Sequence, residues 1–408
     1  MLKKIIESCP KEVDLTNDRN SQIIIETVRS ILDKGYSISE IEEIEEQLIS
    51  ENDNSLIFTL LSLKIAKSKI LASSITEPLL ISVVFAVYKE NNRIKKSSEH
   101  AHGEDFLLKK VRQLEWLFEN QPNVEWELII VDDGCPEGSG RIAQNIIDKN
   151  QLNNRVRVLY LSEAIKQKYP PVRTMSSTEE SQKGGSIVYG MWQAVQQNKT
   201  KNQIVIYTDA DLSTHLSQVM LLVDPILNQN KLVAIGSRRE PKSVVIKKGT
   251  RNDRGKLFIY LWKRLIPNLG KIVDTQCGFK AFRSEIISEL IDGLIEKKFA
   301  FDIELLLKAE LLKKGAITKV PIAWIDSEAA STTTDLQPYL PMLKSISKMS
   351  KKYFPKEETS NEFSHFIESL NEEEFNDILQ NIPHDIVKRK PDEFTEYDKV
   401  RVSDFRKY

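Results

Sequence analysis

Two aspartates one residue apart, Asp209 and Asp211, follow a short apolar run at 204–207. The run predicts a buried strand, whose end places both carboxylates at the edge of a sheet, where open α/β sheets bind ligands. Carboxylate oxygens suit a hard divalent cation, Mg²⁺ or Mn²⁺, that also bridges phosphate oxygens. Because Asp is common in turns, the motif by itself is equally compatible with an acidic turn that holds no ligand.

A second pair of acids, Asp132 and Asp133, ends an apolar run at 126–131. Successive strand side chains point to opposite faces, so one acid can face a ligand while the other holds the turn. Carboxylates accept hydrogen bonds strongly and therefore suit ribose hydroxyls and the N–H edge of a base. The glycines that follow permit a tight turn into a helix that we expect at 139–149.

Two cationic residues, Lys183 and Arg238, stand at the ends of predicted elements. Lys183 and Gly184 stand at the start of a helix, where a glycine allows close backbone approach, the N-terminus favours anions and the lysine adds a positive charge. Arg238 follows a strand expected at 232–237 and opens a basic segment, 238–264, with ten Lys or Arg against two acids. These cations indicate an anionic ligand, although a solvated loop and helix would have the same composition.

Two further acids are candidates for the same site. Asp274 begins the stretch 274–280, in which an acid, an amide and a glycine precede an aromatic strand, an order that suggests a pocket wall. Asp302 opens an amphipathic helix expected at 302–314. It is either the N-terminal cap of that helix or a residue of the site, and the sequence leaves both interpretations open.

Strands and helices alternate along the middle of the chain. The apolar runs are nearly continuous, which is typical of parallel strands buried on both faces, and amphipathic helices separate them. This alternation predicts an α/β fold with a mostly parallel sheet sandwiched by helices. The strands are expected at 80–88, 126–131, 155–161, 204–207, 232–237 and 317–324, with an aromatic strand after residue 278.

The flanking regions are predicted to be helical and contain no chemical motif. A capping-box pattern runs from Ser39 to Glu42, and 54–74 has an amphipathic period. We expect residues 1–78 to pack on the rest of the chain or to join copies of it into a homo-oligomer. The predicted division is a helical accessory region at 1–78, the α/β domain at 79–354 and an acidic helical extension at 355–408.

The segment 340–354 combines an apolar stripe at helical spacing with four lysines and no acid. Such a helix can lie on an anionic membrane surface, where each cation contributes about 1 kcal/mol. Alternatively, it packs on the α/β domain with its lysines in water. The lysines are Lys344, Lys348, Lys351 and Lys352.

The composition bears on solubility, on nucleic-acid binding and on membrane association. The 408 residues are 40% apolar and 29% charged, which is ordinary for a soluble protein, and the formal net charge of −1 gives no reason to expect a nucleic-acid partner. The three cysteines and the N-terminal Met-Leu-Lys-Lys favour a reducing, cytoplasmic location. Since no apolar run approaches the roughly eighteen residues of a membrane span, membrane contact is expected to be peripheral, through 340–354.

The order of these motifs resembles glycosyltransferase family 2, of GT-A fold. Within that family it is most similar to the dolichyl-phosphate β-glucosyltransferases and their bacterial polyprenyl-phosphate relatives. The resemblance covers about residues 80–350. The matching stretches are Ser82–Glu90, Val131–Gly134, Lys183–Ser186, Thr208–Asp211, Gly236–Arg238, Asp274–Lys280 and Phe299–Leu306.

The resemblance implies an enzyme with a UDP-sugar donor. Asp209 and Asp211 would hold Mg²⁺ or Mn²⁺ against the diphosphate, and the cation and Arg238 would stabilise the charge of the leaving group. A hydroxyl acceptor needs a general base, for which Asp274 is the best candidate, whereas a phosphate acceptor needs cations instead. The residues beside the base and ribose would be Ala86, Tyr88, Glu90, Asp132 and Asp133.

Three hypotheses follow. The first is a metal-dependent inverting transfer of a sugar, glucose by resemblance, to a polyprenyl phosphate. The second keeps the donor chemistry but uses a soluble or protein hydroxyl acceptor. The third is a non-catalytic scaffold that binds a nucleotide sugar, and the intact set of candidate site residues argues against it. The motif match favours the polyprenyl phosphate as acceptor.

Overall fold

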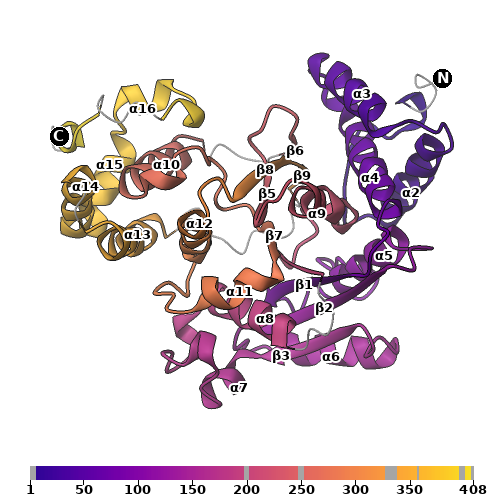
Figure 1. Cartoon of the computed structure of the whole chain (residues 1–408), viewed down its shortest axis with the longest axis horizontal. Coiled ribbons are helices and arrows are strands. Elements are labelled where there is room, and N and C mark those ends of the chain that lie inside the picture. The colour runs from indigo at the N-terminus through magenta and orange to yellow at the C-terminus, as the bar shows by residue number, and fades with distance from the viewer. Residues whose placement is uncertain are drawn as a thin grey trace.

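The computed structural model describes residues 6–196, 202–246, 252–326, 338–355, 358–394 and 400–405. A seven-stranded sheet forms its centre, and in Figure 1 it runs from β3 at the bottom to β8 at the top, in the order β3-β2-β1-β4-β7-β5-β8. Neighbouring strands are parallel except where β7 pairs antiparallel with β4 and β5. The mostly parallel α/β fold that the sequence predicted is confirmed. The strands are β1 (Leu79–Val87), β2 (Val124–Asp132), β3 (Val156–Tyr160), β4 (Gln203–Thr208), β5 (Val233–Ser237), β7 (Phe279–Arg283) and β8 (Ile317–Pro321).

Side chains alternate between two hydrophobic cores, one on each face of the sheet. On β1, Val83 and Phe85 enter one core and Val84 enters the other, as the two-residue period of a strand requires. The first core contains residues of α5 (Phe106–Leu117), α6 (Ser139–Lys149) and α9 (Val219–Asn228). The second contains residues of α7 (Leu161–Lys166), α8 (Gly184–Gln196), α11 (Ser284–Ile291) and α12 (Phe301–Leu312).

The antiparallel strand β7 positions the loop before it. Its register with β4 pairs Thr208 with Phe279, so residues 274–278 arrive beside the carboxyl end of β4. The backbone N–H of Asp209 donates to the carbonyl of Gly278 at 3.1 Å. The direction of β7 therefore brings the predicted pocket wall next to the Asp209–Asp211 turn.

The N-terminal helices pack against the sheet domain, at the right of Figure 1. α4 (Ile57–Ser73) is buried on nearly every side and belongs to the same core as β1, so the amphipathic pattern expected at 54–74 is wrong. α2 (Asp18–Leu32) and α3 (Ile38–Ser50) pack around it. The capping box lies two residues earlier than predicted, with Ser37 as the N-cap of α3 and Glu40 as its partner. Because the core is continuous across residue 78, the division there stays a prediction.

The C-terminal helices gather at the left of Figure 1, around α10 (Asn252–Leu265). They are α13 (Tyr339–Tyr353), α14 (Glu358–Ser369), α15 (Glu372–Gln380) and α16 (His384–Lys388). The apolar stripe of α13 is inside the protein, with Leu343, Ile346 and Met349 fully buried among these helices. Of the two interpretations of 340–354, packing of the apolar stripe on protein is therefore confirmed, and the orientation of that stripe toward lipid is wrong. An amphipathic period marks an apolar neighbour without saying whether it is lipid or protein.

The last predicted strand is divided in two. β8 ends at Pro321, and β9 (Ala323–Ile325) pairs instead with β6 (Val244–Ile246) in a separate two-stranded sheet. This second sheet places Trp324 beside the residues that follow β5. Within the described ranges, no helix is long and apolar enough to cross a membrane.

Candidate functional site

Most of the predicted site residues meet at one edge of the sheet. Because β1, β2, β4 and β5 run in the same direction, their carboxyl ends lie side by side, and antiparallel β7 begins at that edge. Tyr88 and Glu90 follow β1, Asp132 ends β2, Asp209 follows β4 and Arg238 follows β5. Arg238 and Asp274, 36 residues apart in sequence, come into contact there.

Asp209 forms an ion pair with Lys183, which precedes α8. The side chains are 35% and 28% exposed, so solvent reaches both partners. Burial alone would raise the pKa of Asp209, but the positive charge of Lys183 lowers it. The pair shows that the acid of β4 and the lysine of the Lys-Gly-Gly-Ser stretch belong to one cluster.

Among the residues that the structure describes, none forms an ion pair with the side chain of Asp211, which is held by hydrogen bonds instead. Its Oδ1 accepts from the N–H of Ser213 at 3.0 Å, and its backbone carbonyl accepts from Lys110 Nζ at 2.7 Å. Burial and the nearby Asp209 carboxylate raise the pKa of Asp211. Burial also lowers the pKa of Lys110 to about 8.

Lys110 is a residue that the sequence prediction missed. It is fully buried and lies on the same face of α5 as Phe106 and Leu114. A lysine on the apolar face of an amphipathic helix is the signal that was available, because such a cation is seldom buried without a partner.

Arg238 and Asp274 form a two-pronged ion pair. Nε donates to Oδ2 at 2.9 Å, Nη2 donates to Oδ1 at 2.7 Å, and the backbone N–H of Arg238 donates to Oδ2 at 2.8 Å. The guanidinium also lies 5.2 Å from the ring centroid of Trp324. Such a fork fixes the plane of the guanidinium as well as its position.

The same contacts bear on the predicted role of Asp274 as a general base. Both carboxylate oxygens are engaged, and the side chain is only 3% exposed. Burial would raise the pKa of Asp274, but the Arg238 guanidinium holds it below its usual value. A carboxylate with a lowered pKa is a weak base, so this geometry suits the positioning of Arg238 better than proton abstraction.

The two acids at the end of β2, Asp132 and the following Asp133, hold the backbone of the surrounding loops. Asp132 accepts from the N–H groups of Gly134, Cys135 and Gly140 at 3.0, 2.9 and 2.7 Å. Asp132 therefore fixes the turn into α6. Its role in binding a nucleoside stays a prediction.

Asp133 fixes the start of α8 instead. It accepts from the N–H of Lys183 at 2.8 Å and from the hydroxyl of Ser186 at 2.7 Å. Lys183 itself has a φ of +91°, a conformation that few non-glycine residues adopt. Asp133 thus stabilises an unusual backbone conformation that directs Lys183 toward Asp209, and its predicted role in nucleoside binding also stays a prediction.

Gly184 makes its close approach to protein rather than to open space. A Cβ at this position would lie 2.6 Å from the carbonyl oxygen of Lys298, and the N–H of Gly185 donates to the carbonyl of Lys297 at 2.8 Å. The glycine pair therefore lets the start of α8 pack on the backbone of 297–298. Contact of Gly184 with a ligand stays a prediction.

Asp302 is not the cap of its helix. α12 begins at Phe301, with Ala300 in the N-cap position, and Asp302 accepts from Lys280 Nζ at 3.0 Å. Lys280, fully buried in β7, also donates to the carbonyl of Cys277 at 2.5 Å. Burial raises the pKa of Asp302 and lowers that of Lys280. Lys280 therefore links Asp302 to the 274–278 loop through the Cys277 carbonyl. The sequence signal for this pair was a lysine inside the apolar strand 279–282.

The residues after β1 differ in exposure. Tyr88 is 48% exposed, whereas Glu90 is buried and bonded to Arg93 Nη1 at 3.0 Å. Arg93 also binds Glu104 through two nitrogens, each at 3.1 Å. Burial raises the pKa of Glu90 to about 6, although Arg93 opposes the shift. Ala86, at the end of β1, is half-buried.

The donor set is compatible with a divalent cation that binds together with a phosphorylated ligand. In the described part of the chain, no three His, Cys, Asp or Glu side chains are grouped to hold a metal ion. Magnesium sites of this type use one or two carboxylates, with substrate phosphates and waters as the remaining ligands. Asp209 and Asp211 fit that pattern, and Gly278 leaves room for the Asp209 carboxylate, because a Cβ there would lie 2.3 Å from both of its oxygens.

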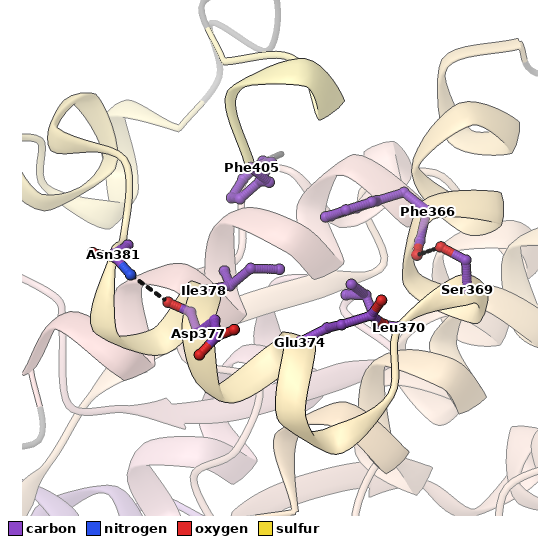
Figure 2. Close-up of a pocket in the computed structure, with 8 residues that line it drawn as sticks. All are labelled: Phe366, Ser369, Leu370, Glu374, Asp377, Ile378, Asn381 and Phe405. Carbon is purple, nitrogen blue, oxygen red and sulfur yellow. Dashed lines mark hydrogen bonds between the residues drawn. The ribbon is translucent and has the colours of Figure 1, made fainter. Parts of the chain in front are cut away.

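A groove of about 380 Å³ lies elsewhere, among α14, α15 and Phe405 (Figure 2). Phe366, Leu370 and Ile378 provide its apolar wall, and Glu374 and Asp377 its acids. None of the residues that line it belongs to the strand-end cluster.

Several known proteins are similar to this chain in sequence or in fold. The family model for Glycosyl transferase family 2 matches residues 82–291. The chain is 27% identical over 263 residues to the dolichyl-phosphate beta-glucosyltransferase of Saccharomyces cerevisiae, covering 61% of this chain and 67% of that protein. It is also 27% identical over 260 residues to the human dolichyl-phosphate beta-glucosyltransferase, covering 61% and 68%. Among solved structures, mannosyl-3-phosphoglycerate synthase from Rubrobacter xylanophilus is similar with a TM-score of 0.46 and 15% identity, covering 71% of this chain and 78% of that one.

Proposed function

Because the chain belongs to glycosyl transferase family 2, we propose that it transfers glucose from a UDP-sugar to a polyprenyl phosphate in a metal-dependent, inverting reaction. The two relatives above, both named dolichyl-phosphate beta-glucosyltransferases, support this donor sugar and acceptor class. The observation that carries the proposal is the Arg238–Asp274 fork at the same sheet edge as the Lys183–Asp209 pair.

The chemistry requires charge stabilisation at the leaving group. As the bond between the sugar and the diphosphate breaks, negative charge develops on the diphosphate. Arg238 is held in one orientation by Asp274 and therefore needs little reorganisation to meet that charge. A cation held by Asp209 and Asp211 would supply further positive charge to the same oxygens. Inversion by a single in-line displacement needs no covalent intermediate with the protein.

The state of Asp274 favours an anionic acceptor. A hydroxyl acceptor needs a base, whereas a phosphate monoester is already largely ionised and attacks without one. Since Asp274 is fully engaged by Arg238 and has a lowered pKa, it is poorly suited to remove a proton. This argument supports the polyprenyl phosphate over the alternative soluble or protein hydroxyl.

The residues after β1 and β2 would receive the nucleoside. Tyr88 exposes its ring at the sheet edge, where it can stack on a base. Ala86, two residues earlier, has a small side chain that would not obstruct a base there. Glu90, Asp132 and Asp133 would hold the loops around the nucleoside in place, through the bonds of Glu90 to Arg93 and of the two aspartates to backbone N–H groups.

The decisive experiment measures transfer and hydrolysis side by side. The protein is incubated with Mn²⁺ and a panel of UDP- and GDP-sugars, with and without a short-chain polyprenyl phosphate. We expect glucose transfer from UDP-glucose to the lipid phosphate, with little reaction from GDP-sugars. Hydrolysis alone, or transfer only to a soluble hydroxyl acceptor included in a parallel reaction, would contradict the proposed acceptor.

A further inference from the structure

The ammonium group of Lys183 is bonded to Asp209, one of the two carboxylates that would hold the cation. Lys183 Nζ bonds to Asp209 Oδ1, and Asp209 would be a ligand of the divalent ion in the proposed function. Two positive ions cannot share that oxygen at close range without strong repulsion. Binding of the cation therefore requires Lys183 to leave Asp209.

The backbone of Lys183 is held by hydrogen bonds, whereas its side chain is held through the single ammonium at its end. Asp133 holds the N–H of Lys183, and the carbonyl of Lys183 accepts from Ile187 within α8. The side chain is 28% exposed and ends in a single ammonium on a flexible stem. The residue can thus exchange partners by side-chain rotation, whereas Arg238 is fixed by a fork and a third backbone bond.

Once displaced, Lys183 needs a new anion. The side chain of Lys183 is only partly exposed, so an ammonium there without an anionic partner is unfavourable. Asp302 and Asp211 also attract Lys183, but Asp302 is already bonded to Lys280, and Asp211 would be the second ligand of the cation. The diphosphate of the donor provides an anion that arrives with the cation.

We propose that Lys183 is an exchangeable counter-ion: it neutralises Asp209 until a divalent cation and a nucleoside diphosphate bind together, and then transfers to the diphosphate. The inference rests on the proposed function, because it takes Asp209 as a cation ligand. Its consequence is a coupling between the two ligands. The cation alone binds weakly, since it must release Lys183, and the diphosphate strengthens cation binding because it accepts the released ammonium.

Binding measurements test this without turnover. Mn²⁺ affinity is measured by electron paramagnetic resonance, without and with saturating UDP, for wild type, Lys183→Gln, Lys183→Arg and the control Lys166→Gln. Lys166 is an exposed lysine on α7 whose replacement leaves the cluster intact. In wild type we expect UDP to strengthen Mn²⁺ binding by about tenfold or more, within the usual range of such couplings.

Lys183→Gln should move the two quantities in opposite directions. Mn²⁺ alone should bind about three- to tenfold more tightly, because its competitor is gone. The strengthening by UDP should be smaller than in wild type, because the phosphate oxygens still ligate the cation but no ammonium is released. Lys183→Arg and Lys166→Gln should retain most of the wild-type coupling. Thermal unfolding of each variant reports whether the fold is kept.

The outcomes separate the two proposals. If Lys183→Gln binds Mn²⁺ alone no more tightly than wild type, or if UDP strengthens Mn²⁺ binding equally in both, the counter-ion exchange is wrong and the metal site stands. If wild type binds no Mn²⁺ with or without UDP, the metal-dependent function fails, and this inference fails with it.

Discussion

Gly278 lies against the carboxylate of Asp209, so closely that a Cβ at position 278 would be 2.3 Å from both carboxylate oxygens. The antiparallel register of β7 with β4 produces this contact, and the bond from the Asp209 N–H to the Gly278 carbonyl at 3.1 Å fixes it. The glycine of the Asp-Thr-Gln-Cys-Gly-Phe-Lys stretch thus determines where the carboxylate of the Asp-Ala-Asp stretch can lie.

Gly278→Ala should displace Asp209 and weaken cation binding in the presence of UDP by about tenfold or more, which corresponds to about 1.4 kcal/mol. The measurement is Mn²⁺ affinity with saturating UDP. Gly255→Ala is the matched control, because a Cβ at Gly255 meets nothing within 4 Å. Equal Mn²⁺ affinity in the two variants would contradict the role of this contact.

Asp211→Ala should lower transfer at least about 100-fold, because several kcal/mol of charge stabilisation depend on the cation. Metal-dependent donor binding should be lost while the thermal unfolding transition is kept. Asp148→Ala, at an exposed acid of α6, serves as the control. Near-normal turnover of Asp211→Ala, or full wild-type activity in a chelator, would exclude this use of the metal.

Asp274→Asn should reduce kcat about 100-fold with little change in the affinity for UDP-glucose. The amide keeps the shape of the side chain but cannot form two charge-assisted bonds with Arg238, so the guanidinium loses its fixed orientation. The measurement is kcat and donor affinity for this variant and for Arg238→Lys, which loses the fork from the other side. A large loss of donor binding in Asp274→Asn would mean that the residue acts on the donor ground state.

Breaking the buried pair of Lys280 and Asp302 should destabilise the fold strongly. Lys280→Met leaves Asp302 buried without its partner, at a cost of about 3–5 kcal/mol in the free energy of unfolding. The double variant with Asp302→Leu replaces both polar partners by apolar side chains and should recover much of that loss. Denaturant unfolding of the single and double variants gives the comparison, and additive losses would contradict coupling between the two residues.

Glu90 should make stability fall as the pH rises. Its pKa is raised from 4.5 to about 6 in the folded protein, so the folded state binds the proton more tightly than the unfolded chain does. The contribution is favourable below about pH 4.5, and roughly 2 kcal/mol of it is lost as the pH rises through about 6. The free energy of unfolding of wild type minus that of Glu90→Gln, measured from pH 4 to 7, should decrease over this window. A flat or rising difference would contradict the raised pKa.

The fold class, and the sheet edge at which the candidate site residues gather, were predictable from the sequence. Near-continuous apolar runs alternating with amphipathic helices admit few arrangements other than a parallel sheet covered by helices, and parallel strands must present their carboxyl ends at one edge. Residues that directly follow such runs, Asp209 and Arg238 among them, were therefore predictable as neighbours. A lysine within an apolar strand or on the apolar face of a helix, as at Lys280 and Lys110, was a readable sign of a buried partner.

The sequence did not show which charges form pairs. The pairing of Lys183 with Asp209, and of Arg238 with Asp274, depends on strand order and on the antiparallel direction of β7, because these residues are 26 and 36 positions apart and no local pattern links them. The same holds for α13. Its amphipathic period required an apolar neighbour, but burial of Leu343 and Ile346 among the C-terminal helices, rather than in lipid, followed from the packing of segments distant in sequence. Periodicity reports that a face avoids water, and the rest of the fold determines what covers it.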